Sequence, residues 1–298
     1  MVTNGSDQSR LAALDVEHPE WRPLLALIDA ASREAQRQDW ARVIPAPEHD
    51  GADGRPLIDG AVVSVPPKLV GRWVRQILAL AAAAGTEIAP LAHAIDAGWL
   101  DPSLLFEAAI SHDVERFHVI ARVDTDYRGV LRGLAALIAM PMLQACERAW
   151  RHRVPAAWPH GYCPICGAWP SLAETRGLDG GRHLRCGCCG ADWPAQPLRC
   201  PFCGETDHQL LGALVSAEVV ERYAIDVCDG CQGYLKAFTT LSPIRPVDVL
   251  LEDLATLVLD MAALERDYRR PATRGRAITV GVIAEPQRFW NRLFARRP

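Results

Sequence analysis

Eight of the ten cysteines in this chain of 298 residues stand in four Cys-x-x-Cys pairs. The pairs are Cys163/Cys166, Cys186/Cys189, Cys200/Cys203 and Cys228/Cys231. A Cys-x-x-Cys turn directs two thiolates to one point, and two such turns joined by a hairpin give a tetrahedral four-sulfur site that suits zinc or iron. The spacing therefore predicts two metal ions, each bound by four cysteines.

An internal duplication indicates how the four pairs combine. Cys163-Pro-Ile-Cys-Gly matches Cys200-Pro-Phe-Cys-Gly, and each is followed by a second pair after a gap that fits two strands and a turn. We therefore expect sequential rather than interleaved pairing. One site is predicted from Cys163, Cys166, Cys186 and Cys189, and the other from Cys200, Cys203, Cys228 and Cys231.

The residue after each pair also fits metal binding. Gly167, Gly190 and Gly204 follow three of the pairs, and Gln232 takes this place in the last one. Glycine permits the left-handed turn that lets backbone N–H groups point at the first sulfur of the pair. The three turns with glycine are therefore predicted to adopt this conformation, whereas Gln232 departs from the pattern.

The chemistry of such sites is left open by the ligands alone. A four-cysteine site is closed to substrate and most often holds a small fold together, whereas iron in the same site could carry an electron. Exchangeable dithiols in a redox protein are the competing interpretation of the pairs. The sequence has no phosphate loop, no Gly-x-Ser-x-Gly and no His-Glu-x-x-His, so we predict that the protein is not an enzyme.

The two remaining cysteines are expected to play smaller roles. Cys188 lies inside a pair and could replace Cys186 or Cys189 in a shifted register, but we favour a spare thiol beside the site. Cys146 stands among apolar residues of a long predicted helix, which favours a buried, inert side chain.

Apolar periodicity around the cysteines predicts an α+β fold. A helical N-terminal domain is expected at 1–155, interrupted by an exposed loop at 45–67. The tandem rubredoxin- or zinc-ribbon-like module follows at 156–241, with a hairpin turn at Gly180-Gly181. A C-terminal helix at 242–268, with one apolar face, is expected to pack back on the body, and a loosely ordered tail at 269–298 completes the chain.

The predicted helices of the N-terminal domain lie at about 69–84, 87–97, 102–111, 113–122 and 125–153, and β-prone runs of the module at 210–215 and 219–227.

Charge and hydropathy restrict partners and location. The net charge is −4, and residues 161–240 hold more acidic residues than lysines and arginines, which argues against nucleic-acid binding. The longest apolar runs are too short to span a bilayer, so no membrane insertion is expected. Paired cysteines that bind metal fit a reducing compartment, and we predict a cytoplasmic protein.

The order of these features resembles the formate dehydrogenase accessory protein family, FdhE. The resemblance rests on Tyr162-Cys-Pro-Ile-Cys-Gly, Leu184-Arg-Cys-Gly-Cys-Cys-Gly-Ala-Asp-Trp193, Arg199-Cys-Pro-Phe-Cys-Gly and Cys228-Asp-Gly-Cys-Gln-Gly-Tyr-Leu-Lys236. It continues into an acidic, leucine-rich stretch, Leu251-Glu-Asp-Leu-Ala-Thr-Leu-Val-Leu-Asp260. The specific match covers about residues 160–260.

The resemblance implies a cytoplasmic, chaperone-like maturation factor that binds the catalytic subunit of respiratory formate dehydrogenase before export. It also implies iron at the rubredoxin-like cysteine motifs, and all eight cysteines of these motifs are present here. Two other functions are weighed against it. One is a rubredoxin-like protein that transfers electrons or thiols during metalloenzyme maturation, and the other is a nucleic-acid-binding zinc ribbon, which the acidic module disfavours. The oligomeric state is left open.

Overall fold

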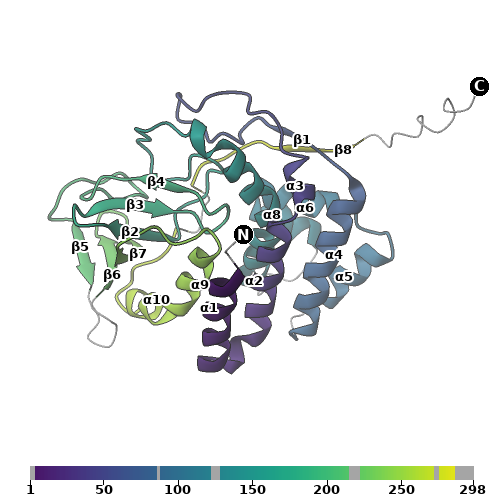
Figure 1. Ribbon diagram of the computed structural model, residues 1–298, viewed down its shortest axis with the longest axis horizontal. Helices are drawn as coiled ribbons and strands as arrows, with labels where there is room; N and C mark the ends of the chain where they lie inside the picture. The colour runs from purple at the N-terminus through teal and green to yellow at the C-terminus, as the bar shows by residue number, and fades with distance from the viewer. Residues whose placement is uncertain (1–3, 86–87, 122–127, 215–221, 272–274, 286–298) are drawn as a thin grey trace, which may run out of the picture.

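The structure, a computed structural model, describes residues 4–85, 88–121, 128–214, 222–271 and 275–285. A helical body lies beside a six-stranded mixed sheet, and two short helices cover part of that sheet (Figure 1). The predicted α+β fold class is confirmed.

The helical body is built around one long helix, α8. Its elements are α1 (Asn4–Glu17), α2 (Arg22–Ala35), α3 (Gln38–Ala41), α4 (Pro67–Ala83), α5 (Ala89–Asp96), α6 (Pro102–Ile110), α7 (Val114–Ala121) and α8 (Arg128–Trp150). Helices α2, α4, α6 and α7 all pack against α8. The predicted helices at 69–84, 87–97, 102–111 and 113–122 correspond to α4–α7, whereas the predicted start of the last helix, 125–127, lies outside the described residues.

Within the described part of the chain, the stretch Val130–Arg153 is long and apolar enough to cross a membrane by length and composition. However, 78% of its most apolar window is buried inside the molecule, as befits the central helix of a packed body.

The six-stranded sheet contains both cysteine repeats. Its order is β4-β3-β2-β7-β6-β5, with β2 (Leu172–Arg176), β3 (Gly181–Arg185), β4 (Asp192–Pro194), β5 (Leu211–Leu214), β6 (Tyr223–Cys228) and β7 (Gly233–Thr240). Each repeat supplies three antiparallel strands, and parallel pairing of β2 with β7 joins them. The two ribbons are therefore one continuous sheet. The β-prone residues 215 and 219–221 lie outside the described residues.

The predicted C-terminal helix is instead two helices, α9 (Asp248–Ala255) and α10 (Leu257–Leu264), separated at Thr256. The cause is Lys236 on β7, which is 1% exposed. Its ammonium group donates to the main-chain oxygens of Asp253 and Thr256, at 2.6 and 3.4 Å, and to the Asp260 carboxylate at 2.7 Å. The buried cation thus binds the Asp253 carbonyl in the last turn of α9, and also the Thr256 carbonyl, which accepts from the Leu259 N–H at 3.0 Å as well.

This break also redirects the predicted apolar face. Val249 and Leu251 on α9 are buried, as expected of a helix that packs back on the body. On α10 the apolar residues Leu257, Val258 and Met261 are instead exposed. The prediction of a single buried apolar face is therefore wrong for the α10 half.

Two further predictions need correction. The loop at 45–67 is not wholly exposed, because Leu57 and Ile58 are buried and donate their backbone N–H groups to the carbonyls of Pro164 and Ile165. The tail is not loosely ordered at 275–285: β8 (Gly281–Ala284) pairs in parallel with β1 (Val62–Val65). Residues 286–298 lie outside the described residues.

Candidate metal sites

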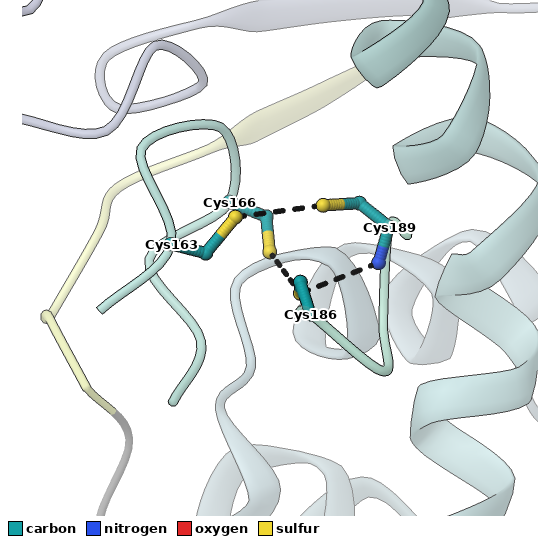
Figure 2. A group of neighbouring side chains, drawn as sticks. All are labelled: Cys163, Cys166, Cys186 and Cys189. Atoms are coloured by element: carbon teal, nitrogen blue, oxygen red, sulfur yellow. Dashed lines mark hydrogen bonds between the residues drawn. The ribbon is translucent and has the colours of Figure 1, made fainter. Parts of the chain in front are cut away.

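The first site consists of Cys163, Cys166, Cys186 and Cys189, which converge from two loops (Figure 2). The sulfurs of Cys163 and Cys189 are 3.5 Å apart, as are those of Cys166 and Cys186. A disulfide would need about 2.05 Å. Four sulfurs around an ion at about 2.3 Å would lie about 3.8 Å from one another in a tetrahedron. The spacing therefore fits a metal ion and not a pair of disulfides.

The second site consists of Cys200, Cys203, Cys228 and Cys231. Its sulfurs are 3.7 Å apart for Cys200 and Cys231 and 3.7 Å for Cys203 and Cys228. In each site all four sulfurs lie within 4.8 Å of one another. The structure thus places the eight predicted ligands in two groups that could hold metal ions, with the expected sequential pairing.

The turns that carry the cysteines share one backbone conformation. Gly167, Gly190 and Gly204 have φ values of +76°, +77° and +81°, and Gln232 has +54°. In the first three turns the N–H of this glycine donates to the carbonyl of the leading cysteine, four residues earlier. The left-handed conformation favours glycine, so Gln232 is the one turn residue of this set that holds it with a side chain.

The two sites differ in burial. All four cysteines of the first site are 0% exposed. In the second site Cys200 and Cys228 are buried, whereas Cys203 and Cys231 are exposed. The first site is enclosed because the 56–58 loop and the C-terminal segment close over it: Pro56 and Ile278 approach the Cα of Gly167 so closely that a side chain there would meet both. The second site has no such cover within the described residues.

Burial also sets the electrostatics of the thiols. It raises the pKa of Cys163, Cys166 and Cys189 above the usual value for a thiol. In the second site burial raises the pKa of Cys200 to about 11. Only thiolates bind metal, so an ion must supply the charge that keeps these buried sulfurs deprotonated, and metal binding would release protons.

The other two cysteines lie apart from these groups. Cys188 is half-buried and is not one of the four converging sulfurs of the first site. Cys146 on α8 is 0% exposed, and burial raises the pKa of its thiol, which confirms the prediction of a buried, inert side chain.

One feature that was not predicted lies between the two sites. The linker Ala156–Tyr162 and the turn Arg199–Gly204 border a cavity of about 620 Å³. The linker approaches the turn so closely that a Cβ on Gly161 would lie 1.8 Å from the Pro201 carbonyl oxygen. The clustering of aromatic residues and prolines in the linker was the sequence feature that could have indicated this cavity, although by itself it indicates only a rigid connection.

Comparisons with known proteins agree with this architecture. The family model described as "FdhE, C-terminal domain" matches residues 198–274. A curated relative named Protein FdhE homolog from Aquifex aeolicus is 32% identical over 114 residues, which are 37% of this chain and 40% of the relative. The homolog of the same name from Pseudomonas aeruginosa is 36% identical over 114 residues, or 36% and 37% of the two chains. These matches span well under half the length of the relatives.

The crystal structure of the FdhE protein from Pseudomonas aeruginosa covers 92% of this chain and 94% of that protein, with a TM-score of 0.60 and 22% identity. At that identity the likeness shows the fold. Together these comparisons confirm the resemblance to the FdhE family: residues 198–274 match the model of its C-terminal domain, and most of the chain has the fold of the FdhE protein from Pseudomonas aeruginosa.

Proposed function

We propose that this protein is an accessory factor for the maturation of formate dehydrogenase, which binds the catalytic subunit in the cytoplasm and carries two metal ions. The observation that carries the proposal is the pair of four-cysteine groups in FdhE order, in a chain whose residues 198–274 match the FdhE C-terminal domain. The identity of the partner enzyme, formate dehydrogenase, is inferred from the family resemblance.

The eight cysteines of the two sites are proposed as the metal ligands, and iron or zinc as the metal. A closed four-thiolate site offers no coordination position to a substrate, so we infer a non-catalytic role. In this role the metals hold the sheet that presents a binding surface. The proposed divisions are a helical domain at 1–155, the metal module at 156–241 and the C-terminal helices at 242–268.

We place the partner surface at the junction between the helical body and the ribbons, since ligand sites favour domain junctions. The test is capture of the catalytic subunit by the tagged, metal-loaded protein from cells that make both. Protein in which Cys163 and Cys228 are both serine should lose capture along with its metals. Failure of the folded, metal-loaded protein to retain the catalytic subunit would overturn the proposal.

A redox role is the second candidate, and the exposure of Cys203 and Cys231 favours it. Iron in the second site would exchange electrons with a partner through these exposed ligands. This function predicts a red protein whose visible absorbance bleaches reversibly on reduction. Colourless, zinc-loaded protein purified without oxygen would contradict it, because zinc has no redox chemistry in such a site.

A further inference from the structure

The cavity of about 620 Å³ lies where the linker, the first ribbon and the leading turn of the second ribbon meet. Its volume is within the range of about 300–1,000 Å³ typical of ligand sites. It borders the second metal site through Cys200 and Cys203, yet most of its wall is made of other side chains. The two cysteine groups do not account for this space.

Aromatic rings form much of the wall, and neighbouring groups hold them in place. His160 stacks on Tyr162 at 4.8 Å between centroids, and Trp169 meets Phe202 edge to face at 5.4 Å. The Trp158 indole N–H donates to the Tyr162 carbonyl at 2.8 Å, and the Tyr162 hydroxyl donates to the Gly54 carbonyl at 2.8 Å. Rings that are fixed in this way lose little freedom on binding, and they favour another aromatic ring at their faces or edges.

The cavity lining also carries basic side chains next to the cysteines of the second site. It includes Arg182 and Arg199 and no aspartate or glutamate. Arg182 is already used, since it pairs with Asp226 at 2.7 Å and donates to backbone carbonyls. Arg199 is half-buried, and within the part of the chain that the structure describes no carboxylate pairs with it. A guanidinium in this setting is available for an anion from outside.

His160 is the third basic side chain of the lining. Burial, and then the charges of Arg276 and Arg199, lower the pKa of His160, so its ring is neutral at pH 7. The imidazole therefore contributes to the aromatic wall and leaves the charge of the cavity to the arginines. The lining thus combines aromatic rings with the guanidinium of Arg199.

We propose that this cavity binds a peptide segment of the catalytic subunit, through one aromatic side chain inserted among the rings and an adjacent carboxylate paired with Arg199. The identity of the partner rests on the proposed function. The chemistry of the segment, an aromatic residue next to an aspartate or glutamate, comes from the cavity itself. In this proposal the two metals have a structural role, because they hold the first ribbon and the leading turn of the second ribbon, which form two walls of the cavity, at a fixed separation.

The direct test uses an array of 15-residue peptides that cover the sequence of the catalytic subunit, probed with the metal-loaded protein. Bound peptides are expected to contain an aromatic residue next to an acidic one, and alanine in place of the aromatic residue should abolish binding. Arg199→Glu should weaken binding of these peptides by about tenfold or more, and Arg199→Gln by less, since a reversed charge repels the carboxylate.

A matched control is Lys68→Glu, the same charge reversal on an exposed residue at the start of α4 in the helical body. It should bind the peptides like the wild type. Metal content must be measured for each variant, because Arg199 stands next to Cys200. If Arg199→Glu binds the peptides as tightly as the wild type, or loses metal without losing peptide, the inference is overturned.

The inference and the proposed function fail in different ways. If peptides bind in an Arg199-dependent way but the intact catalytic subunit is not captured, the cavity is a peptide site and the proposed partner enzyme is wrong. If the Arg199→Glu variant captures the catalytic subunit as well as the wild type does, the proposed partner enzyme is supported and the role of the cavity in binding it is overturned. A photo-reactive residue in place of the exposed Gln196 on the cavity rim should cross-link to the bound segment, whereas one in place of Val16 on α1 should not.

Discussion

Removal of one cysteine from each site should have unequal consequences, although the two sites use the same ligands. Cys163→Ser removes a ligand that is 0% exposed and belongs to the same buried cluster as the helical body. Cys228→Ser removes a ligand from the site in which two of the other three members, Cys203 and Cys231, are already exposed. The substitution at the first site therefore disturbs the packed core, whereas the substitution at the second site disturbs a partly exposed part of the molecule.

The magnitude follows from the energy that a structural metal contributes. Binding is worth about 10–16 kcal/mol in zinc-finger peptides, whereas the whole stability of a native protein is about 5–15 kcal/mol. Loss of the first metal should thus remove about as much free energy as the fold possesses. At the second site the cysteine turns can unfold without the rest of the sheet, because β7 remains paired with β2. Loss of the second metal should therefore destabilise only these turns.

Metal content per chain and limited proteolysis measure this difference. We expect Cys228→Ser to remain folded with one metal per chain and with cleavage confined to the turns at 199–204 and 228–232. We expect Cys163→Ser to lose both metals and its protease resistance, or to be insoluble. A Cys163→Ser protein with one metal and native protease resistance, or a Cys228→Ser protein without any metal, would refute the reasoning.

Three further predictions follow from buried and exposed groups. Iodoacetamide should modify Cys203 and Cys231 first, as mass spectrometry of short reactions would show, because these thiols are exposed. Lys236→Met should lower the free energy of unfolding in urea by about 3–5 kcal/mol, since it leaves buried carboxylates with less positive charge. Burial opposes ionisation of Asp253, but Arg270 and Lys236 hold its pKa below the usual value, so this stability should be lost as the pH falls below about 4 through the folded pKa.

Each of these has a contrary outcome. Equal labelling of first-site and second-site cysteines would contradict the difference in burial. If Asp253→Asn combined with Lys236→Met is as unstable as the sum of the two single changes, the proposed ion pair is absent, because paired groups are not additive. Stability that rises on acidification through the range below pH 4 would contradict the lowered pKa of Asp253.

The sequence predicted the local features of the sites well, since cysteine pairing depends on short-range spacing and on a visible duplication. The left-handed turns followed from glycine at Gly167, Gly190 and Gly204, and only Gln232 needed the structure. The parallel pairing of β2 with β7 could not be predicted. It joins Leu172 to Lys236 across more than sixty residues, and no periodic pattern records such a register.

Tertiary contacts also explain the errors. The apolar stripe over 247–264 is continuous in sequence, but Lys236 from another element interrupts the helix at Thr256. Likewise the segment before β8 has an Arg- and Pro-rich composition, which suggests a loose tail, yet Ile278 and Val280 are buried against the body. In both cases a distant partner overrode a local preference.

The central claim is that the chain holds two metal ions, each bound by four cysteine sulfurs. Elemental analysis of anaerobically purified protein, with X-ray absorption at the edge of the metal found, tests it most directly. We predict two metals per chain and a shell of four sulfurs at about 2.3 Å; the visible spectrum of the same sample would distinguish iron from zinc. One metal per chain, or a shell that contains nitrogen or oxygen ligands, would contradict the claim.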